Sequence, residues 1–541
     1  MTKELSSVPW WKKGVIYQIY PRSFMDSNND GIGDIKGIIS KLDYLNDGTP
    51  NSLGVDAIWI SPIYKSPMKD FGYDISDYQD IDNIFGNIDD FKLLLQEAHK
   101  RNIKVIMDLV INHTSDEHPW FIEARKSKNN PKRDWYIWHD NKGKRPSNWV
   151  ASFEMKNAWW LDEKTNQYYL GTFTRHQPEL NWRNPELKEA VYDMIRHWLD
   201  MGVDGFRMDV VNWYIKDDQY RNNPWKLSFN PIDVQRHIYD RNRPETHDIC
   251  KEIRAITDKY ADRMLVGEIY ANDAREAVSY HGVENDELHM AFNFSFLFQR
   301  WSASGFYNNI MEYYNLLPED AWPNFTLSNH DQPRHYSRYR EGEYTDAKAK
   351  VAAAMLLTLK GTPFIYYGEE IGMASEKIAK KDIQDPLGKK GWPIIKGRDD
   401  ARTPMQWDGS EHAGFSDHLP WLRVNSDYKH KNVSVQSKEE YSLLNFYKKL
   451  IWLRKVSNAL SAGDIEFLIK EPDNVLVYKR TFSNEEVIVV LNFTRSKQTV
   501  NLDKEGKVLL GTHRYDGERV SLNKWKIYPL EVLILKKISS V

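Results

Sequence analysis

Short apolar segments alternate along the chain with longer segments in which apolar residues recur at helical spacing. Eight of the short segments predict buried β-strands, because near-continuous apolar runs of about four to eight residues are typical of strands covered on both faces. The predicted strands span residues 15–20, 57–61, 105–110, 205–209, 264–268, 291–296, 324–328 and 363–367.

Two of the intervening helices carry clear boundary signals. Asn87 precedes an amphipathic segment at 88–101, and Asn184 with Pro185 begins a second helix that stops at Gly202. Eight strands alternating with helices predict a parallel (β/α)8 TIM barrel. A doubly wound open sheet is the competing α/β interpretation, but no glycine-rich dinucleotide-binding turn follows the first strand.

Two stretches interrupt this alternation and predict additional domains. Residues 113–179, between the third and fourth strands, are aromatic and poor in helix signals, which predicts a small inserted domain over the barrel mouth. From about residue 464 to 541 the pattern becomes all-β, with alternating segments at 475–480 and 487–493 around a turn at 483–486. This predicts a C-terminal antiparallel β-sandwich, and leaves residues 1–112 and 180–463 for the barrel.

Long loops are expected after the fourth and eighth strands, at residues 212–244 and 368–422. Loops at the carboxyl ends of barrel strands surround the usual position of an active site. Their length should therefore narrow an open cleft towards a pocket.

Composition excludes several classes of partner. The chain has 541 residues, a net charge of −3 and a pI near 6.6, so neither nucleic acid nor an anionic membrane is an expected partner. The N-terminal stretch has no apolar signal core and no apolar run is long enough to cross a bilayer, so a cytoplasmic location is expected. The single cysteine, Cys250, lies on a helical apolar stripe and is interpreted as a buried, inert thiol.

Three of the predicted strands end in carboxylates, which points to a shared site. The fourth strand places Arg207 and Asp209 on one face because side chains alternate along a strand. Glu268 closes the fifth strand, and Asp331 follows the seventh. In a TIM barrel these carboxyl ends converge, so we expect the three acids to lie close together. An aromatic content of 13% also suits stacking against sugar rings.

The segments that carry these acids resemble a known family. DLVINH (108–113), GFRMD (205–209), VGEIY (266–270) and SNHD (328–331) look like the four signature regions of the α-amylase family of glycoside hydrolases. WWKKGVIYQIYPRSF, DGIGD, GYDISDY, QPELNW and GRDDARTPMQW resemble its α-glucosidase and oligo-1,6-glucosidase branch. The resemblance covers nearly the whole chain and implies an exo-acting α-glucosidase.

The chemistry of the family fits these residues. Retaining glycoside hydrolysis needs an ionised nucleophile and a protonated acid about 5–5.5 Å apart. Asp209 suits the nucleophile, because Arg207 should hold it ionised, and Glu268 suits the acid/base, because an apolar setting would raise its pKa. By resemblance, Asp331 is the third carboxylate, which bonds the sugar hydroxyls.

The resemblance also implies a set of substrate-binding residues. Tyr73 and Asp74 look like the stacking platform and hydroxyl partner of the terminal glucose, and Arg402 resembles a second clamp on that ring. The other implied residues are His113 and His330, which would hold the glucose, and Phe153, Phe173 and Gln177 in the pocket wall. The aromatic residues can equally be the core of the inserted domain.

A loop after the first strand predicts a cation site. Asp26, Asn28, Asp30, Ile32 and Asp34 have the spacing of the start of a calcium-binding loop, although Gly37 stands where the closing glutamate is expected. A solvated Asp/Asn turn is the simpler alternative. The same run occurs in the resembling branch as a structural cation loop, so calcium is expected, with magnesium possible, and no organic cofactor.

Linkage preference depends on fewer signals. Val210 resembles the residue type of α-1,6-specific members, whereas α-1,4-specific members tend to have alanine or threonine there. The loops at 221–245 and 383–400 resemble general α-glucosidases instead. An α-1,6-leaning α-glucosidase on short α-glucosides is therefore expected, with an α-1,4 enzyme or a glucosyltransferase as alternatives.

Two alternatives come from other functional classes. A transporter-associated heavy chain would need a membrane-spanning segment and has usually lost the catalytic carboxylates. A non-catalytic carbohydrate-binding protein would not need all three acids, and this chain has Asp209, Glu268 and Asp331. Both are therefore disfavoured. No signal in the sequence indicates the oligomeric state.

Overall fold

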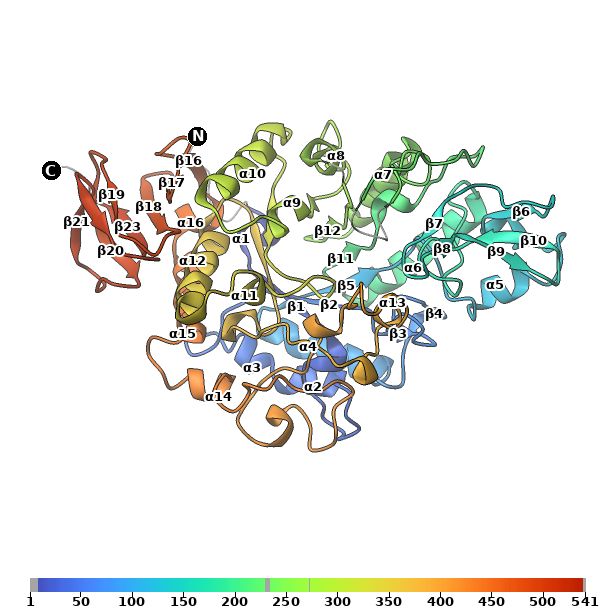
Figure 1. Cartoon of the computed structure of the whole chain (residues 1–541), viewed down its shortest axis with the longest axis horizontal. Helices are drawn as coiled ribbons and strands as arrows, with labels where there is room; N and C mark the ends of the chain where they lie inside the picture. Colours follow the sequence, from blue (N-terminus) through green and yellow to red (C-terminus); the bar gives the residue numbers. More distant parts are fainter. Residues whose placement is uncertain (1–7, 229–233, 272, 539–541) are drawn as a thin grey trace.

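A computed structural model describes residues 8–228, 234–271 and 273–538 of the chain (Figure 1). Residues 229–233, inside the predicted long loop at 212–244, and residues 1–7, inside the N-terminal stretch discussed above, lie outside the described residues. Eight parallel strands form the central sheet, in the order β13-β12-β11-β5-β2-β1-β15-β14. They are β1 (Ile16–Ile19), β2 (Ala57–Ile60), β5 (Lys104–Leu109), β11 (Gly205–Met208), β12 (Met264–Gly267), β13 (Met290–Ala291), β14 (Asn324–Thr326) and β15 (Thr362–Tyr366).

This sheet is a nearly closed barrel, as the alternating pattern predicts. Within the described residues, β13 and β14 stand at its two ends and are not paired with each other. Between them the ring of Phe296 packs on that of Phe325, with centroids 4.7 Å apart. Phe296 belongs to the short helix α9 (Phe294–Leu297), so a helix fills the seam.

The sixth predicted strand is mostly wrong. Residues 291–296 were expected as one strand, but β13 contains only Met290 and Ala291. The side chain of Asn293 accepts a hydrogen bond from the Phe296 amide and caps helix α9. A local side-chain cap therefore competes with strand pairing in an apolar run that has no polar alternation.

The helical boundary signals are confirmed. Helix α4 (Ile88–Lys100) is capped by Asn87, and α6 (Pro185–Met201) is capped by Asn184 and ends at Gly202, whose φ of 106° is left-handed. Such a φ favours glycine, because a Cβ would clash with the backbone. The other long barrel helices are α7 (Glu245–Thr257), α10 (Ala303–Leu316), α12 (Thr345–Thr358) and α15 (Leu443–Val456), and shorter ones are α2 (Ile35–Ser40), α3 (Leu42–Leu45), α8 (Ala274–Ser279) and α16 (Asn458–Ala462).

The insertion between β5 and β11 is a small unit of short strands. It contains helix α5 (Pro119–Ala124), a three-stranded antiparallel sheet and a two-stranded ribbon. The strands are β6 (Trp138–Asp140), β9 (Trp159–Asp162) and β10 (Gln167–Leu170) in the sheet, and β7 (Val150–Ala151) and β8 (Lys156–Asn157) in the ribbon. Figure 1 shows this unit at one end of the molecule and the C-terminal sheet at the other.

The C-terminal region is an antiparallel domain, as predicted. Its six-stranded sheet has the order β16-β17-β18-β23-β20-β21, and β19 pairs with β22. The strands are β16 (Asp464–Phe467), β17 (Val475–Phe482), β18 (Glu485–Asn492), β19 (Gln498–Val500), β20 (Glu505–Gly511), β21 (Arg519–Ser521), β22 (Trp525–Ile527) and β23 (Val532–Lys537). Alternate residues of β17 explain the layering: Val477 packs inside this domain, whereas Leu476 and Tyr478 pack on the barrel core.

The predicted turn of the C-terminal hairpin is shorter than expected. Phe482 pairs with Glu485, so only Ser483 and Asn484 form the turn. Ser483 has a φ of 50°, which the two-residue turns of hairpins commonly require.

Candidate active site

Arg207 is the centre of a buried charged cluster at the carboxyl ends of the barrel strands. Its guanidinium Nη1 lies 2.6 Å from Asp209 Oδ1 and 2.8 Å from Asp108 Oδ1, and Nη2 lies 2.7 Å from Glu268 Oε2. Strands β5, β11 and β12 are neighbours in register, which brings these ends together. The expected convergence of Asp209 and Glu268 is therefore seen, and Asp108 joins them.

One guanidinium cannot balance three carboxylates in a buried site. Burial raises the pKa of Asp108 to about 6 and raises the pKa of Asp209 and Glu268, while Arg207 opposes all three shifts. The expectation that Arg207 keeps Asp209 ionised neglected this sharing of its charge. The cluster as a whole favours at least one bound proton near neutral pH.

Glu268 is suited to carry that proton. Its Oε2 accepts the Val210 amide at 3.1 Å and contacts Arg207, whereas its Oε1 is buried and accepts no hydrogen bond from the described residues. An unpartnered buried oxygen is costly unless another group or a bound ligand satisfies it.

Asp331 lies across from this cluster in a different electrostatic setting. Its Oδ1 is 2.8 Å from Arg402 Nη2 and 3.5 Å from Arg398 Nη1. Burial alone would raise the pKa of Asp331, but the nearby positive charges outweigh it and lower the pKa. Burial also lowers the pKa of the adjacent His330 to about 3, so this histidine is neutral near pH 7 and the two arginines keep Asp331 ionised.

A cavity of about 1330 Å³ opens over these acids. The predicted residues that line it are Tyr73, His113, Phe153, Phe173, Gln177, Asp209, Val210, Glu268 and Asp331. The long loops after the fourth and eighth strands both contribute, for example with Trp213 and Arg398. Arg207, His330, Asp74 and Arg402 were also predicted but are not among the lining residues.

One wall of the cavity is a connected group of side chains around Tyr73. His113 Nε2 lies 3.0 Å from the Tyr73 carbonyl and 3.1 Å from Gln177 Nε2. His330 lies beneath this wall, with its ring stacked on Tyr73 at a centroid distance of 5.4 Å and 3° between the planes. Both histidines are thus close to the site, but only His113 faces the cavity.

Asp74 does not occupy the predicted position. Its carboxylate accepts hydrogen bonds from Ser66 Oγ and from the amides of Lys69 and Asp70, and its side chain is fully buried. Asp70 lines the cavity instead. Asp74 therefore holds its own loop, and the aspartate that faces the cavity is the one four residues earlier.

A similar shift separates Arg402 from Arg398. Arg402 is fully buried and donates to the His330 carbonyl at 2.8 Å. It therefore contacts Asp331 from the side away from the cavity. Arg398 lines the cavity, with Nη2 2.6 Å from Asp70 Oδ1 and 2.8 Å from Asp385 Oδ1. The only sequence signal was that both arginines lie in the GRDDARTPMQW stretch.

The aromatic wall comes from the inserted unit and the β11 loop. Phe153 and Phe173 have ring centroids 5.6 Å apart, and Phe173 lies 5.9 Å from Trp213. Val210 packs in the same cluster and has a φ of 38°, which a β-branched residue rarely adopts. Such outliers are common at functional sites, where the surrounding structure enforces them.

The predicted cation loop is ordered by its own hydrogen bonds. Asp26 accepts the amides of Asn28, Asn29 and Gly31, and Asp34 caps helix α2 through the Gly37 amide. A Cβ at Gly37 would lie 1.9 Å from the Met25 carbonyl oxygen, which explains why glutamate is absent there.

Calcium binding at this loop stays a prediction. Among the described residues, no group of three or more His, Cys, Asp or Glu side chains is arranged to hold a metal. The predicted ligand set also includes Asn28 and Ile32, which belong to none of these four residue types.

In the described part of the chain, none of the helices combines the length and apolar character that spanning a membrane requires. The cytoplasmic location expected from the sequence stays a prediction.

Comparisons with known proteins agree with this geometry. The catalytic domain of alpha amylase matches residues 18–463, and the alpha-amylase C-terminal domain matches residues 463–528. The oligo-1,6-glucosidase of Parageobacillus thermoglucosidasius is 42% identical over 97% of this chain and 99% of its own length, and that of Bacillus cereus is 41% identical with the same coverage. Among solved structures, the alpha-glucosyl transfer enzyme XgtA matches with a TM-score of 0.90 and 38% identity, over 98% of this chain and 100% of that one.

These matches cover the barrel, the inserted unit and the C-terminal domain together. The chain belongs to the α-amylase family of glycoside hydrolases.

Proposed function

We propose that this protein is a retaining exo-acting α-glucosidase that releases glucose from the non-reducing end of short α-glucosides, with a preference for α-1,6 linkages. The observation that carries the proposal is the binding of Asp209 and Glu268 to the two ends of one buried guanidinium, at the floor of a cavity. Sharing one guanidinium holds the two carboxyl groups close together. Close carboxyl groups favour direct attack by one of them, whereas inverting enzymes need room for a water.

In the first step, a carboxylate oxygen of Asp209 attacks the anomeric carbon as the bond to the leaving oxygen breaks. Glu268 gives its proton to that oxygen, for which its unpartnered Oε1 is available. The product is a covalent glycosyl-enzyme. In the second step, Glu268 takes a proton from water, whose oxygen attacks the anomeric carbon and releases Asp209, so the α-configuration is retained.

The predicted residues that line the cavity around the two catalytic acids form the seat for the glucose. Asp331, held ionised between Arg398 and Arg402, would accept hydrogen bonds from the sugar hydroxyls. His113 and Gln177 would contribute neutral polar groups, and Tyr73 a stacking face, while Phe153 and Phe173 close one side. The ion pair between Glu154 and Lys390 joins the inserted unit to the loop after β15, which supports a pocket closed on that side.

The α-1,6 preference rests on two supports. Val210 lines the cavity beside the nucleophile, and several relatives at 40–42% identity are named oligo-1,6-glucosidases. Glucosyl transfer is the alternative, since XgtA is named for it and transfer shares the glycosyl-enzyme intermediate. An α-1,4 preference would be the other outcome.

The first experiment follows the products of isomaltose, maltose and sucrose by NMR in parallel. Initial α-glucose, released fastest from isomaltose, is the expected result. Initial β-glucose would overturn retention, fastest release from maltose would overturn the linkage preference, and products larger than the substrate would establish transfer.

Azide rescue of two alanine variants then assigns the acids. With an aryl α-glucoside and azide, Asp209→Ala should give β-glucosyl azide, because azide replaces the nucleophile on the opposite face. Glu268→Ala should give α-glucosyl azide, because azide intercepts the glycosyl-enzyme. Reversed products would exchange the two roles, and α-azide from both variants would contradict Asp209 as nucleophile.

A further inference from the structure

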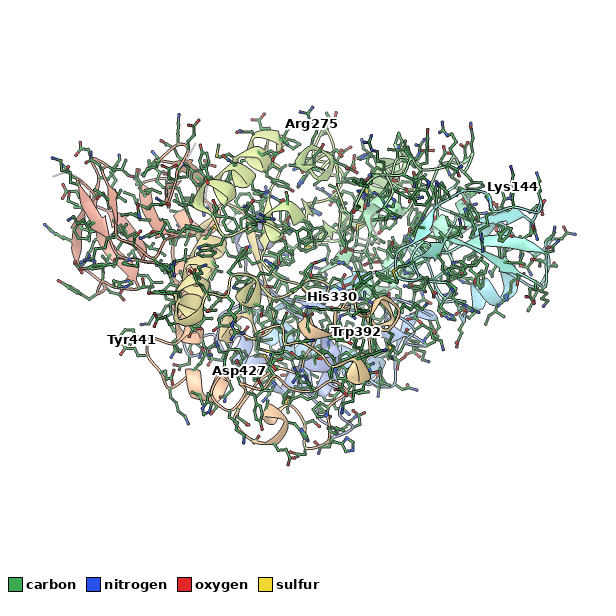
Figure 2. All side chains as sticks on the ribbon, in the orientation of Figure 1. Lys144, Arg275, His330, Trp392, Asp427 and Tyr441 are labelled. Atoms are coloured by element: carbon green, nitrogen blue, oxygen red, sulfur yellow. The ribbon has the colours of Figure 1, made fainter. Side chains whose placement is uncertain are left out.

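The side chain of Gln18 contacts His330 from below the glucose seat. Gln18 lies on β1 and is 2% exposed, and its Nε2 is 2.8 Å from His330 Nδ1 and 3.4 Å from Ser61 Oγ. His330 itself is 1% exposed, and Figure 2 shows it near the centre of the molecule. This contact lies inside the barrel, and Gln18 has no role in the site described above.

The other nitrogen of His330 faces the cavity wall. His330 Nε2 lies 2.6 Å from the Tyr73 hydroxyl, and that hydroxyl lies 3.2 Å from Asp108 Oδ2. Asp108 is the carboxylate that Arg207 holds at 2.8 Å, beside Asp209 and Glu268. A continuous chain of polar contacts thus runs from Gln18 to the catalytic cluster.

The direction of every hydrogen bond in this chain follows from the first one. In this structure the nitrogen of the Gln18 amide faces His330, and because an amide nitrogen only donates, Nδ1 accepts from Gln18. Because burial lowers the pKa of His330 to about 3, the ring is neutral and its single N–H must be on Nε2. Nε2 therefore donates to the Tyr73 oxygen, which leaves the Tyr73 proton for Asp108.

We propose that Gln18 is a positioning residue, which holds His330 as the Nε2–H tautomer and thereby fixes the Tyr73 hydroxyl that forms part of the glucose seat. The inference rests on the proposed function for its kinetic consequence, but the tautomer itself does not depend on it. With the Gln18 amide turned over, its oxygen would accept from Nδ1–H and Tyr73 would donate to His330. Asp108 would then lose one of its donors.

The direct test is ¹⁵N NMR of the full-length protein labelled at histidine, near pH 7. The His330 signals are assigned by their loss in His330→Asn. We expect an unprotonated Nδ1 and a protonated Nε2 in the unchanged protein. A protonated Nδ1 would overturn the proposal, whatever the enzyme's substrate is.

Variants then connect the tautomer to catalysis. Gln18→Glu offers only an acceptor, so the proton should move to Nδ1, and kcat/KM for isomaltose should fall by about 100-fold, as expected for a displaced contact at the seat. In this variant KM should rise by a larger factor than kcat falls, because the glucose-binding residues are altered and the catalytic acids are not. Gln18→Met should remove the preference for one tautomer of His330, and kcat/KM should fall by less than in Gln18→Glu.

The matched control is Ser61→Ala, which removes the other neighbour of the same amide. It should keep the Nε2–H tautomer and kcat/KM within about twofold. If Gln18→Glu does not fold, the tautomer in the unchanged protein still decides the proposal. Unaltered kinetics in a folded Gln18→Glu whose tautomer has switched would also overturn it. If no glucosidase activity is found at all, only the proposed function fails.

Discussion

Buried arginines stand at both ends of the barrel, and their partners differ. At the carboxyl ends of the strands, Arg207 contacts three carboxylates, Asp108, Asp209 and Glu268, which outweigh burial and raise its pKa. At the opposite end, Arg454 is equally buried but, within the described part of the chain, donates only to backbone carbonyls, and burial lowers its pKa to about 9. Both remain charged near pH 7, for different reasons.

The partners of Arg454 explain its place. It donates to the carbonyls of Leu357 at 3.0 Å, Leu460 at 2.9 Å and Gly361 at 2.8 Å. The last carbonyls of a helix have no donor within the helix and carry partial negative charge. Arg480 does the same for Thr358 at 2.6 Å from the C-terminal domain. These two arginines therefore hold together helices α12 and α16 and the C-terminal domain.

The effect of a buried arginine therefore depends on the groups that it contacts. Around Arg207, several ionisable groups lie close together, so that different protonation states of the cluster are close in energy. Acid–base catalysis requires such groups. Charges that face helix ends satisfy fixed dipoles and stabilise assembly. Changes near Arg207 should therefore alter kinetics, and changes near Arg454 should alter stability.

The largest effect is expected for Asp209→Asn. The amide keeps the shape but cannot attack the anomeric carbon, so kcat/KM for isomaltose should fall by at least about 10⁴-fold. Steady-state kinetics measures this, and circular dichroism checks the fold. Asp464→Asn is the matched control, because Asp464 also pairs with a cation, Lys360, at 2.8 Å, but at the other end of the barrel. A folded Asp209→Asn with ordinary turnover would exclude it as nucleophile.

Arg454→Met should have the opposite signature. Several buried carbonyls lose their donors, which should lower the free energy of unfolding by about 3 kcal/mol or more. The urea midpoint measures this loss, and kcat and KM of the folded fraction should stay unchanged. A change in KM without loss of stability in Arg454→Met would contradict the separation of a catalytic end from a structural end of the barrel.

The catalytic side of this contrast could be predicted from the sequence at the strand ends, whereas the role of Arg454 could not. Asp209, Glu268 and Asp331 were recognisable because each lies at or just after the end of a predicted apolar strand, and because their segments resemble the signature regions of the family. The caps Asn87 and Asn184 were recognisable because the signal is local. The sixth strand was not, since the apolar run around Phe294 suits a strand or a helix and a side chain of Asn293 decides.

The exact wall residues could not be predicted for a different reason. Asp70 and Asp74 are four residues apart in one loop, as are Arg398 and Arg402, and each pair contains one cavity residue and one buried support. Which member faces the cavity depends on how the loop folds over the barrel. The role of Gln18 could not be predicted from the sequence either, because its partner His330 is 312 residues away along the chain.

Within the catalytic end, Val210→Ala should change the substrate selectivity without removing a catalytic group. Val210 is 5% exposed and lines the cavity. A difference of one or two methyl groups discriminates by about 10- to 200-fold, so the ratio of kcat/KM for isomaltose over maltose should fall by about tenfold. Val191→Ala, in the core-facing side of α6, should leave this ratio unchanged. An unchanged ratio in Val210→Ala would assign the preference to the loops.

Calcium should affect stability although its predicted loop is near the catalytic end. Asp26 contacts the segment after β15, with Ser416 Oγ at 2.6 Å from its Oδ2, so a bound ion would order two loops. At a concentration 100-fold above the dissociation constant, binding stabilises the fold by about 2.7 kcal/mol. The melting temperature should therefore rise with calcium and fall with EDTA, with magnesium compared in parallel. Asp30→Asn should reduce the response, and equal melting temperatures in all conditions would contradict a cation site.

His118 in the inserted unit belongs to neither end, and it should affect how stability depends on pH but not the activity. His118 caps α5 by accepting the Trp120 amide at 3.1 Å, and burial lowers its pKa to about 3. In the unfolded chain the pKa is about 6.5, so below that pH the unfolded state takes up a proton that the folded state does not. Stability is therefore lost as pH falls from about 6.5 towards 3, by up to about 1.4 kcal/mol per pH unit.

His118→Asn keeps a capping acceptor and removes the titration, so the free energy of unfolding should depend less steeply on pH between about 6 and 4. Urea denaturation at a series of pH values measures the slope. Above about pH 7.5, His118 is unprotonated in both the folded and the unfolded chain. The free energies of unfolding of the two proteins should then differ only through the changed cap and its packing. Parallel curves over the whole range would show that His118 does not titrate on unfolding. A steeper curve for the variant would reverse the sign of the argument.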